Sequence, residues 1–107
     1  MKKGDILSVQ FPFSSMQELK RRPALVVAVE APDVTVAFIT SNLANRQAYD
    51  VVVQPNILNG LRYSSLIRVV KMATPDSRMI YGRVGELSIA ELQQVDTGLR
   101  AGFALQA

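Results

Sequence analysis

The stretch Lys20-Arg21-Arg22-Pro23-Ala24-Leu25-Val26-Val27-Ala28-Val29 is the strongest indication of the fold in this chain. Three consecutive cations precede a proline, and six small or branched apolar residues follow it without interruption. An uninterrupted apolar run of about four to eight residues, rich in valine, is typical of a strand that is buried on both faces. We therefore expect charge to be concentrated where a polar loop meets the most buried strand. A guanidinium that this strand holds rigidly, while it still faces solvent, is suited to binding an anion.

The composition predicts one small globular domain and restricts the chemistry available to it. A chain of 107 residues can bury a core of its own, so we expect a single domain over residues 1–107. There is no cysteine and no histidine, which excludes disulfides, thiolate metal sites, a cysteine nucleophile and a Ser-His-Asp triad. Any catalysis must use Arg, Lys, Asp, Glu, Ser, Thr or Tyr, and we expect neither a metal nor a cofactor.

The hydropathy pattern predicts a soluble, cytoplasmic protein without a membrane partner. Residues 1–5 lack the apolar region of a signal peptide, and no apolar run approaches the ~18 residues of a membrane span. The net charge of +3 is compatible with nucleic-acid binding, but such an excess is also common in proteins that bind none.

Short apolar segments separated by turn residues predict a sheet of five or six strands. Alternation of apolar and polar residues predicts a first strand over residues 6–11, followed by a polar loop to residue 19. The turn Ala31-Pro32-Asp33 predicts that the strand at 23–29 forms a hairpin with the next one. The remaining strands are expected at 34–40, 49–53 and 64–70, with a short segment that pairs back at 78–81.

The C-terminal region predicts a helix. Ser88 and Glu91 have the spacing of a capping box, in which each side chain bonds the other residue's backbone amide. Apolar residues then recur at helical spacing on one stripe: Leu92, Val95, Leu99 and Phe103. Gly98 and Gly102 weaken this helix by about 1 kcal/mol each relative to alanine, so it needs the sheet behind it. The expected fold is mainly β with a C-terminal helix: a small, strongly curved antiparallel sheet or SH3-like barrel packed by one long helix.

Six segments, in this order over nearly the whole chain, resemble the MazF/PemK family of toxins from bacterial toxin–antitoxin pairs. They are Gly-Asp-Ile at 4–6, Phe-Pro-Phe at 11–13, Lys-Arg-Arg-Pro-Ala-Leu-Val-Val at 20–27, Ile-Thr-Ser-Asn at 39–42, Ser-Leu-Ile-Arg-Val at 65–69 and Gly-Arg-Val-Gly-Glu-Leu-Ser at 82–88. The resemblance implies a homodimeric, metal-independent endoribonuclease that cuts single-stranded RNA, such as mRNA, selectively. It also implies a cognate antitoxin whose C-terminal segment covers the RNA groove.

The resemblance implies three catalytic residues. Arg22 would bind the scissile phosphate and stabilise the charge of the transition state; the structural alternative is an ion pair with Asp5 or Glu18. Thr40 would bond a phosphate oxygen or orient the attacking 2′-hydroxyl, unless it is a strand-end residue in a turn. Arg68 matches a catalytic arginine of PemK-type members. Those members carry an aspartate two residues further on, whereas this chain has Val70, so either Arg22, Thr40 and Arg68 suffice or the activity is weakened.

Other residues are candidates for binding the RNA strand. The expected contacts are Ser14, Ser15, Lys20, Arg21 and Ser41. The serines at 14 and 15 can equally be solvated, and the two cations can equally be a charged sheet edge that discourages pairing between sheets. The aromatic residues Phe13, Tyr49 and Tyr63 either stack on unpaired bases or belong to the core.

RNA cleavage needs neither histidine nor metal, because the 2′-hydroxyl is an internal nucleophile that must be positioned for in-line attack. The expected products are a 2′,3′-cyclic phosphate and a 5′-hydroxyl. Two alternatives stay open. One is a non-enzymatic DNA gyrase poison of the CcdB kind. The other is a binding module on the same fold that has lost catalysis, and valine at position 70 is the feature that keeps this alternative open.

Overall fold

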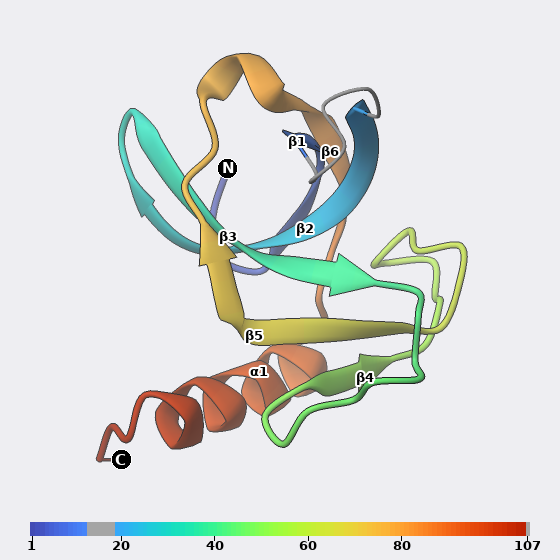
Figure 1. The fold of residues 1–107 in the computed structure, drawn as a ribbon, viewed down its shortest axis with the longest axis vertical. Coiled ribbons are helices and arrows are strands. Elements are labelled where there is room, and N and C mark those ends of the chain that lie inside the picture. Colours follow the sequence, from blue (N-terminus) through green and yellow to red (C-terminus); the bar gives the residue numbers. More distant parts are fainter. Residues whose placement is uncertain (13–18, 107) are drawn as a thin grey trace.

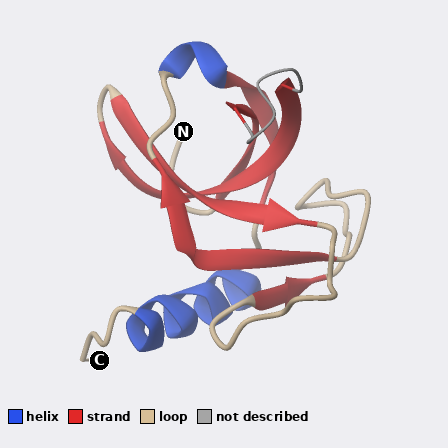
Figure 2. Cartoon of the chain, viewed as in Figure 1, coloured by secondary structure: helices blue, strands red, loops and turns tan. Residues whose placement is uncertain are grey.

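The computed structural model describes residues 1–12 and 19–106 and consists of one curved sheet and one long helix (Figures 1 and 2). The described elements are β1 (Asp5–Pro12), β2 (Leu19–Glu30), β3 (Asp33–Thr40), β4 (Val51–Val53), β5 (Ser65–Ala73), the 3₁₀ turn η1 (Ser77–Met79), β6 (Ile80–Glu86) and α1 (Ile89–Gly102). The six strands form a sheet in the order β4-β5-β3-β2-β1-β6, and every neighbouring pair is antiparallel. The predicted mainly β fold with a C-terminal helix is confirmed.

β2 is buried on both faces because the sheet curls between two apolar cores. Leu25 belongs to the core between the sheet and α1, together with Ile67 and Val95. Ala24 and Val26 point to the opposite face and belong to the core inside the curl of the sheet. Figure 1 shows the curled sheet, with α1 beneath β5 and beside β4. The apolar run after Pro23 is therefore central to the fold, although its end, at Ala28 and Val29, is exposed.

β2 and β3 separate at the end that carries the cations. They pair as the expected hairpin from Glu30 and Asp33 as far as Ala24 and Phe38. Beyond this point β3 continues along β5, where Thr40 faces Leu66, while residues 19–23 of β2 pair with β1 alone. Pro23 lies at the position where the strands part, and proline has no N–H to donate to a neighbouring strand. The divergence opens a space between β2 and the end of β3.

α1 begins as the capping box predicts. The Ser88 hydroxyl accepts from the Glu91 amide at 3.1 Å, and a Glu91 carboxylate oxygen accepts from the Ser88 amide at 2.8 Å. Val95 is fully buried against the sheet, whereas Phe103 is the C-terminal cap and is 49% exposed, so its predicted place on the buried stripe is wrong. A Cβ at Gly98 would lie 3.0 Å from the carbonyl oxygen of Tyr49, so this glycine lets α1 approach the sheet closely. No described helix is long and apolar enough to cross a membrane.

Several strand boundaries differ from the predictions. The three cations lie inside β2 rather than at the end of a loop, because pairing with β1 extends back to Leu19. β4 is shorter than predicted and starts at Val51, while β5 continues to Ala73. The expected short segment at 78–81 is a 3₁₀ turn followed by the longer β6. β6 pairs with β1 through two register shifts, between Ile6 and Leu7 and between Ser8 and Val9.

Candidate active site

A cavity of about 260 Å³ occupies the space that β2 and β3 leave as they part. β2 contributes Arg22 and Pro23, β3 ends in it with Thr40, and β5 contributes Arg68 and Lys71. The remaining lining residues are Phe11, Phe38, Ile39, Asn42 and Asn45. Phe11 and Phe38 pack with their ring centroids 4.5 Å apart. We call this space the catalytic cavity, because the three residues predicted to be catalytic line it.

The catalytic cavity brings together the three residues predicted to be catalytic. Arg22, Thr40 and Arg68 come from three different strands, and none of them is fully exposed. Asp5, one expected alternative partner of Arg22, is bonded to Lys2 and Arg83 instead. The Thr40 hydroxyl oxygen accepts a hydrogen bond from the Asn42 amide at 3.1 Å, so the turn expected as the structural alternative is present. A hydroxyl that accepts in this way retains a proton to donate to a ligand.

Arg68 is held by a carboxylate that the sequence analysis did not single out. Its Nε donates to Oδ1 of Asp50 at 3.1 Å, and the Asp50 side chain is 2% exposed. β4 and β5 pair through Val51 and Ile67, so Asp50 lies opposite Arg68 one step further along the same register. Opposite charges directly across antiparallel strands attract each other. Valine at position 70 cannot pair with Arg68. Asp50, the residue before β4, forms the Arg–Asp pair instead.

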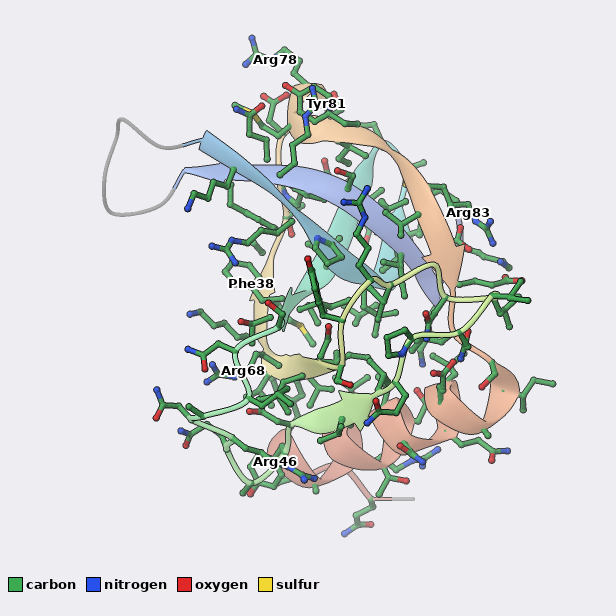
Figure 3. The ribbon with its side chains drawn as sticks, turned by 90° about the vertical axis from the view of Figure 1, so that its right-hand side faces the viewer. Phe38, Arg46, Arg68, Arg78, Tyr81 and Arg83 are labelled. Atoms are coloured by element: carbon green, nitrogen blue, oxygen red, sulfur yellow. The ribbon has the colours of Figure 1, made fainter. Side chains whose placement is uncertain are left out.

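Val70 lies away from the catalytic cavity because β5 carries an irregularity. The pairing of β3 with β5 shifts between Phe38, which faces Arg68, and Ala37, which faces Met72. Val70 contacts the last turn of α1, where a Cβ built on Gly102 would lie 2.4 Å from its Cγ1. Lys71 enters the cavity instead, with its Nζ 5.3 Å from the centre of the Phe38 ring. Figure 3 shows Phe38 and Arg68 on the same side of the molecule.

A second cavity, of about 630 Å³, adjoins the first. The two cavities share three lining residues: Arg22, Pro23 and Ile39. Its walls include three of the residues predicted to bind RNA: Lys20, Arg21 and Ser41. Arg21 is held in place by Tyr81, whose ring centre lies 3.8 Å from the guanidinium carbon. The turn that precedes β5 adds Arg62, which was not predicted, and Tyr63, which was predicted either to stack on a base or to belong to the core. Tyr63 is 66% exposed and is not a core residue.

Ser14, Ser15 and Phe13 lie outside the described residues. Tyr49 packs at the end of α1, with its ring 3.3 Å from the position of a Gly102 Cβ, and it lines neither cavity. Within residues 1–12 and 19–106, no three carboxylates converge in the manner of metal ligands.

The two cavities together form a continuous cationic surface. The catalytic cavity contains Arg22, Arg68 and Lys71, and the second cavity adds Lys20, Arg21 and Arg62. No carboxylate is among the described residues that line them. Two guanidinium groups and a hydroxyl around one small space can bind a phosphodiester and stabilise added negative charge on it. The chemistry that this arrangement favours is therefore catalysis at phosphorus.

Comparison with protein families gives a match over most of the chain. The family described as "PemK-like, MazF-like toxin of type II toxin-antitoxin system" matches residues 2–103. Endoribonuclease MazF2 of Mycobacterium bovis is 34% identical over 95 residues, which are 83% of this chain and 83% of that protein. Endoribonuclease MazF6 of Mycobacterium tuberculosis matches with the same values. These relatives do not favour the gyrase-poison alternative.

Solved structures share the fold at lower identity. Toxin MazF-mt6 of Mycobacterium tuberculosis superposes with a TM-score of 0.78 at 23% identity, covering 96% of this chain and 99% of that one. An endoribonuclease from a mycobacterial species, solved in complex with its cognate antitoxin, gives 0.78 at 16% identity and covers 100% and 98%. The MazE–MazF structure from Deinococcus radiodurans gives 0.73 at 19% identity and covers 99% and 97%.

Proposed function

Because this chain belongs to the family of PemK-like, MazF-like toxins of type II toxin–antitoxin systems, we propose that its catalytic cavity is where this endoribonuclease cuts single-stranded RNA. One observation carries the assignment of the site. Arg22, Thr40 and Arg68, which are far apart in the sequence, line the same small cavity beside a larger cationic one.

The cavity supports a mechanism of positioning and charge stabilisation. The 2′-hydroxyl of the nucleotide before the cut attacks the adjacent phosphorus, and the 5′-oxygen of the next nucleotide leaves. Arg22 and Arg68 bind the non-bridging oxygens and stabilise the additional charge of the pentacovalent transition state. The Thr40 hydroxyl donates to a phosphate oxygen or orients the nucleophile. The products are a 2′,3′-cyclic phosphate and a 5′-hydroxyl.

The second cavity extends the binding surface along the strand. Lys20 and Arg21 contact flanking phosphates, and Ser41 supplies a hydroxyl at the boundary between the cavities. Tyr63 offers an exposed ring on which an unpaired base can stack, as in other proteins that bind single strands. Ser14 and Ser15 complete the proposed set of RNA contacts.

The same cationic surface suits a second ligand, an acidic segment of a cognate antitoxin. The relatives solved with an antitoxin support this proposal, in which the C-terminal segment of the antitoxin covers the RNA groove. We also propose that the toxin is a homodimer, which sedimentation equilibrium of the purified protein tests.

The function is tested with purified protein and a long single-stranded RNA in the presence of EDTA. We expect fragments that end in a 2′,3′-cyclic phosphate and begin with a 5′-hydroxyl, whereas single-stranded DNA of the same sequence stays intact. The Arg22→Ala variant removes a phosphate ligand from the transition state, and we expect its rate to fall by at least about 100-fold.

Arg78→Ala is the matched control. Arg78 is 84% exposed, lines neither cavity, and lies at the top of the molecule in Figure 3, well away from Arg68. It should cleave at the wild-type rate. Intact RNA with well-folded wild-type protein contradicts the proposed activity. Cleavage by Arg22→Ala at the wild-type rate contradicts the assigned site.

A further inference from the structure

Asp50 is a buried carboxylate with both oxygens engaged. Oδ1 accepts from Nε of Arg68 at 3.1 Å, and Oδ2 accepts from the backbone amide of Gln47 at 2.8 Å. The side chain is 2% exposed, while that of Arg68 is 28% exposed. A carboxylate this deeply buried needs such partners to remain charged, so Asp50 and Arg68 form one unit.

The bond to Nε determines which part of Arg68 meets a ligand. A guanidinium carries five N–H donors in one plane, and Asp50 uses the one nearest the stem. The four N–H groups of the two terminal nitrogens remain for a ligand in the cavity that Arg68 lines. Because the group is planar, fixing Nε also fixes the plane in which those donors lie.

Asp50 also holds the segment that lines the catalytic cavity with Asn42 and Asn45. Its Oδ2 bond to Gln47 is accompanied by a bond from the Asp50 amide to the Gln47 carbonyl at 3.2 Å. The Gln47 side chain donates in turn to the carbonyl of Asn45, a lining residue of the cavity. Asp50 therefore ties the 41–50 segment to β5 through Arg68.

We propose that Asp50 is a positioning residue of the cleavage reaction, which orients the guanidinium of Arg68 toward the scissile phosphate. This rests on the proposed function, because it assigns Arg68 to the transition state. Asp50 does not line the cavity and does not touch the RNA, so its effect passes through Arg68 and reaches the chemical step rather than the affinity for substrate.

A double-mutant cycle tests this, with kcat and KM measured on a defined RNA oligonucleotide. Asp50→Asn keeps the size of the side chain and an oxygen that can accept from the Gln47 amide, but it removes the charge that holds Nε of Arg68. We expect kcat to fall by about 10- to 100-fold, with KM within about threefold of wild type. In the Arg68→Ala background the same substitution should change kcat by less than about twofold, because the group it acts on is gone.

Asp5→Asn is the matched control. Like Asp50, Asp5 is a buried aspartate that accepts a hydrogen bond from an arginine Nε, here that of Arg83, but Asp5 and Arg83 line neither cavity. Its kcat should equal that of wild type. If Asp50→Asn does not fold, Asp50→Ser replaces it in the test, because serine leaves Arg68 unchanged but lacks the carboxylate that holds its Nε, and it should lower kcat by a similar factor.

The outcomes separate this inference from the proposed function. A wild-type protein that leaves RNA intact overturns the proposed function, and the inference falls with it. A wild-type protein that cleaves while Asp50→Asn or, in its place, Asp50→Ser retains full kcat overturns the inference alone. Equal losses from Asp50→Asn in the wild-type and Arg68→Ala backgrounds also overturn it, because Asp50 then acts independently of Arg68.

Discussion

At the scale of single residues, the carboxyl of Asp5 makes folding stability sensitive to acid. Asp5 is 3% exposed and accepts from the side chain and backbone of Lys2 and from Nε of Arg83. Burial raises the pKa of this carboxyl, but the bonds from Lys2 and Arg83 lower it more, so the pKa lies below its ordinary value of 3.8. The stability that Asp5 provides is therefore fully present above about pH 4 and is lost as the pH falls through the lowered pKa.

We expect Asp5→Asn to reduce the free energy of unfolding at pH 7 by about 1–3 kcal/mol, because charge-assisted hydrogen bonds to a buried group are lost. Urea unfolding at pH 7 and near pH 3 measures this, and the difference between the variant and wild type should shrink at the lower pH. A difference that is the same at both pH values contradicts the prediction.

Asp76 is the control for this prediction. A side-chain hydrogen bond from Arg78 lowers the pKa of Asp76 to about 2, but both groups are exposed and two residues apart. A contact between such near neighbours can persist in the unfolded chain, and an exposed ion pair contributes little to folding. Asp76→Asn should leave the urea midpoint unchanged at either pH.

Arg68 was predicted from the sequence to be a site residue, whereas its partner Asp50 was not. Arg22, Thr40 and Arg68 were predicted because each lies in a segment that resembles the MazF/PemK family. Asp50 also precedes an apolar strand, but its partner depends on the register between β4 and β5. The connection over residues 54–64 is too long and irregular for its turn chemistry to determine that register.

At the scale of elements, the irregularity in β5 determines which side chains enter the catalytic cavity. Strict alternation would place residues 68 and 70 on the same face. The shifted register instead turns Val70 toward the end of α1 and brings Lys71 beside Arg68. A side chain at position 70 therefore faces α1 rather than the cavity that Arg68 lines.

We expect Val70→Asp to give no increase in cleavage, with kcat within about twofold of wild type. The new carboxylate would lie at the C-terminal end of α1, where negative charge is unfavourable by about 0.3–1 kcal/mol, so a slightly lower urea midpoint is expected. Lys71→Ala is the neighbouring control, because it removes a cation from the cavity and should weaken RNA binding. A gain in kcat for Val70→Asp would show that position 70 faces the substrate.

At the scale of the whole molecule, the curvature of the sheet follows from the apolar run in β2. A strand with Leu25 in one core and Ala24 and Val26 in another requires apolar layers on both faces. One helix covers one face, so the sheet must curl to cover the other. This much was predictable from residues 23–29 and the capping box. The strand order beyond the β2–β3 hairpin could not be predicted, because it depends on pairings between segments that are distant in sequence.

Six of the twelve lysines and arginines line the two cavities, which predicts a strong dependence of RNA binding on salt. Each phosphate neutralised on a single strand adds about −0.7 to the slope of log K against log salt concentration. Lys20→Ala and Arg21→Ala should each make the slope less steep by roughly 0.7 to 1, while affinity at high salt changes little. Binding is measured with 2′-O-methyl RNA, which lacks the nucleophile and is not cut.

Arg100→Ala is the control. Arg100 is exposed on α1 and lines neither cavity, so this substitution removes the same charge and should leave the slope unchanged. Equal slopes for all four proteins would mean that the strand does not follow Lys20 and Arg21.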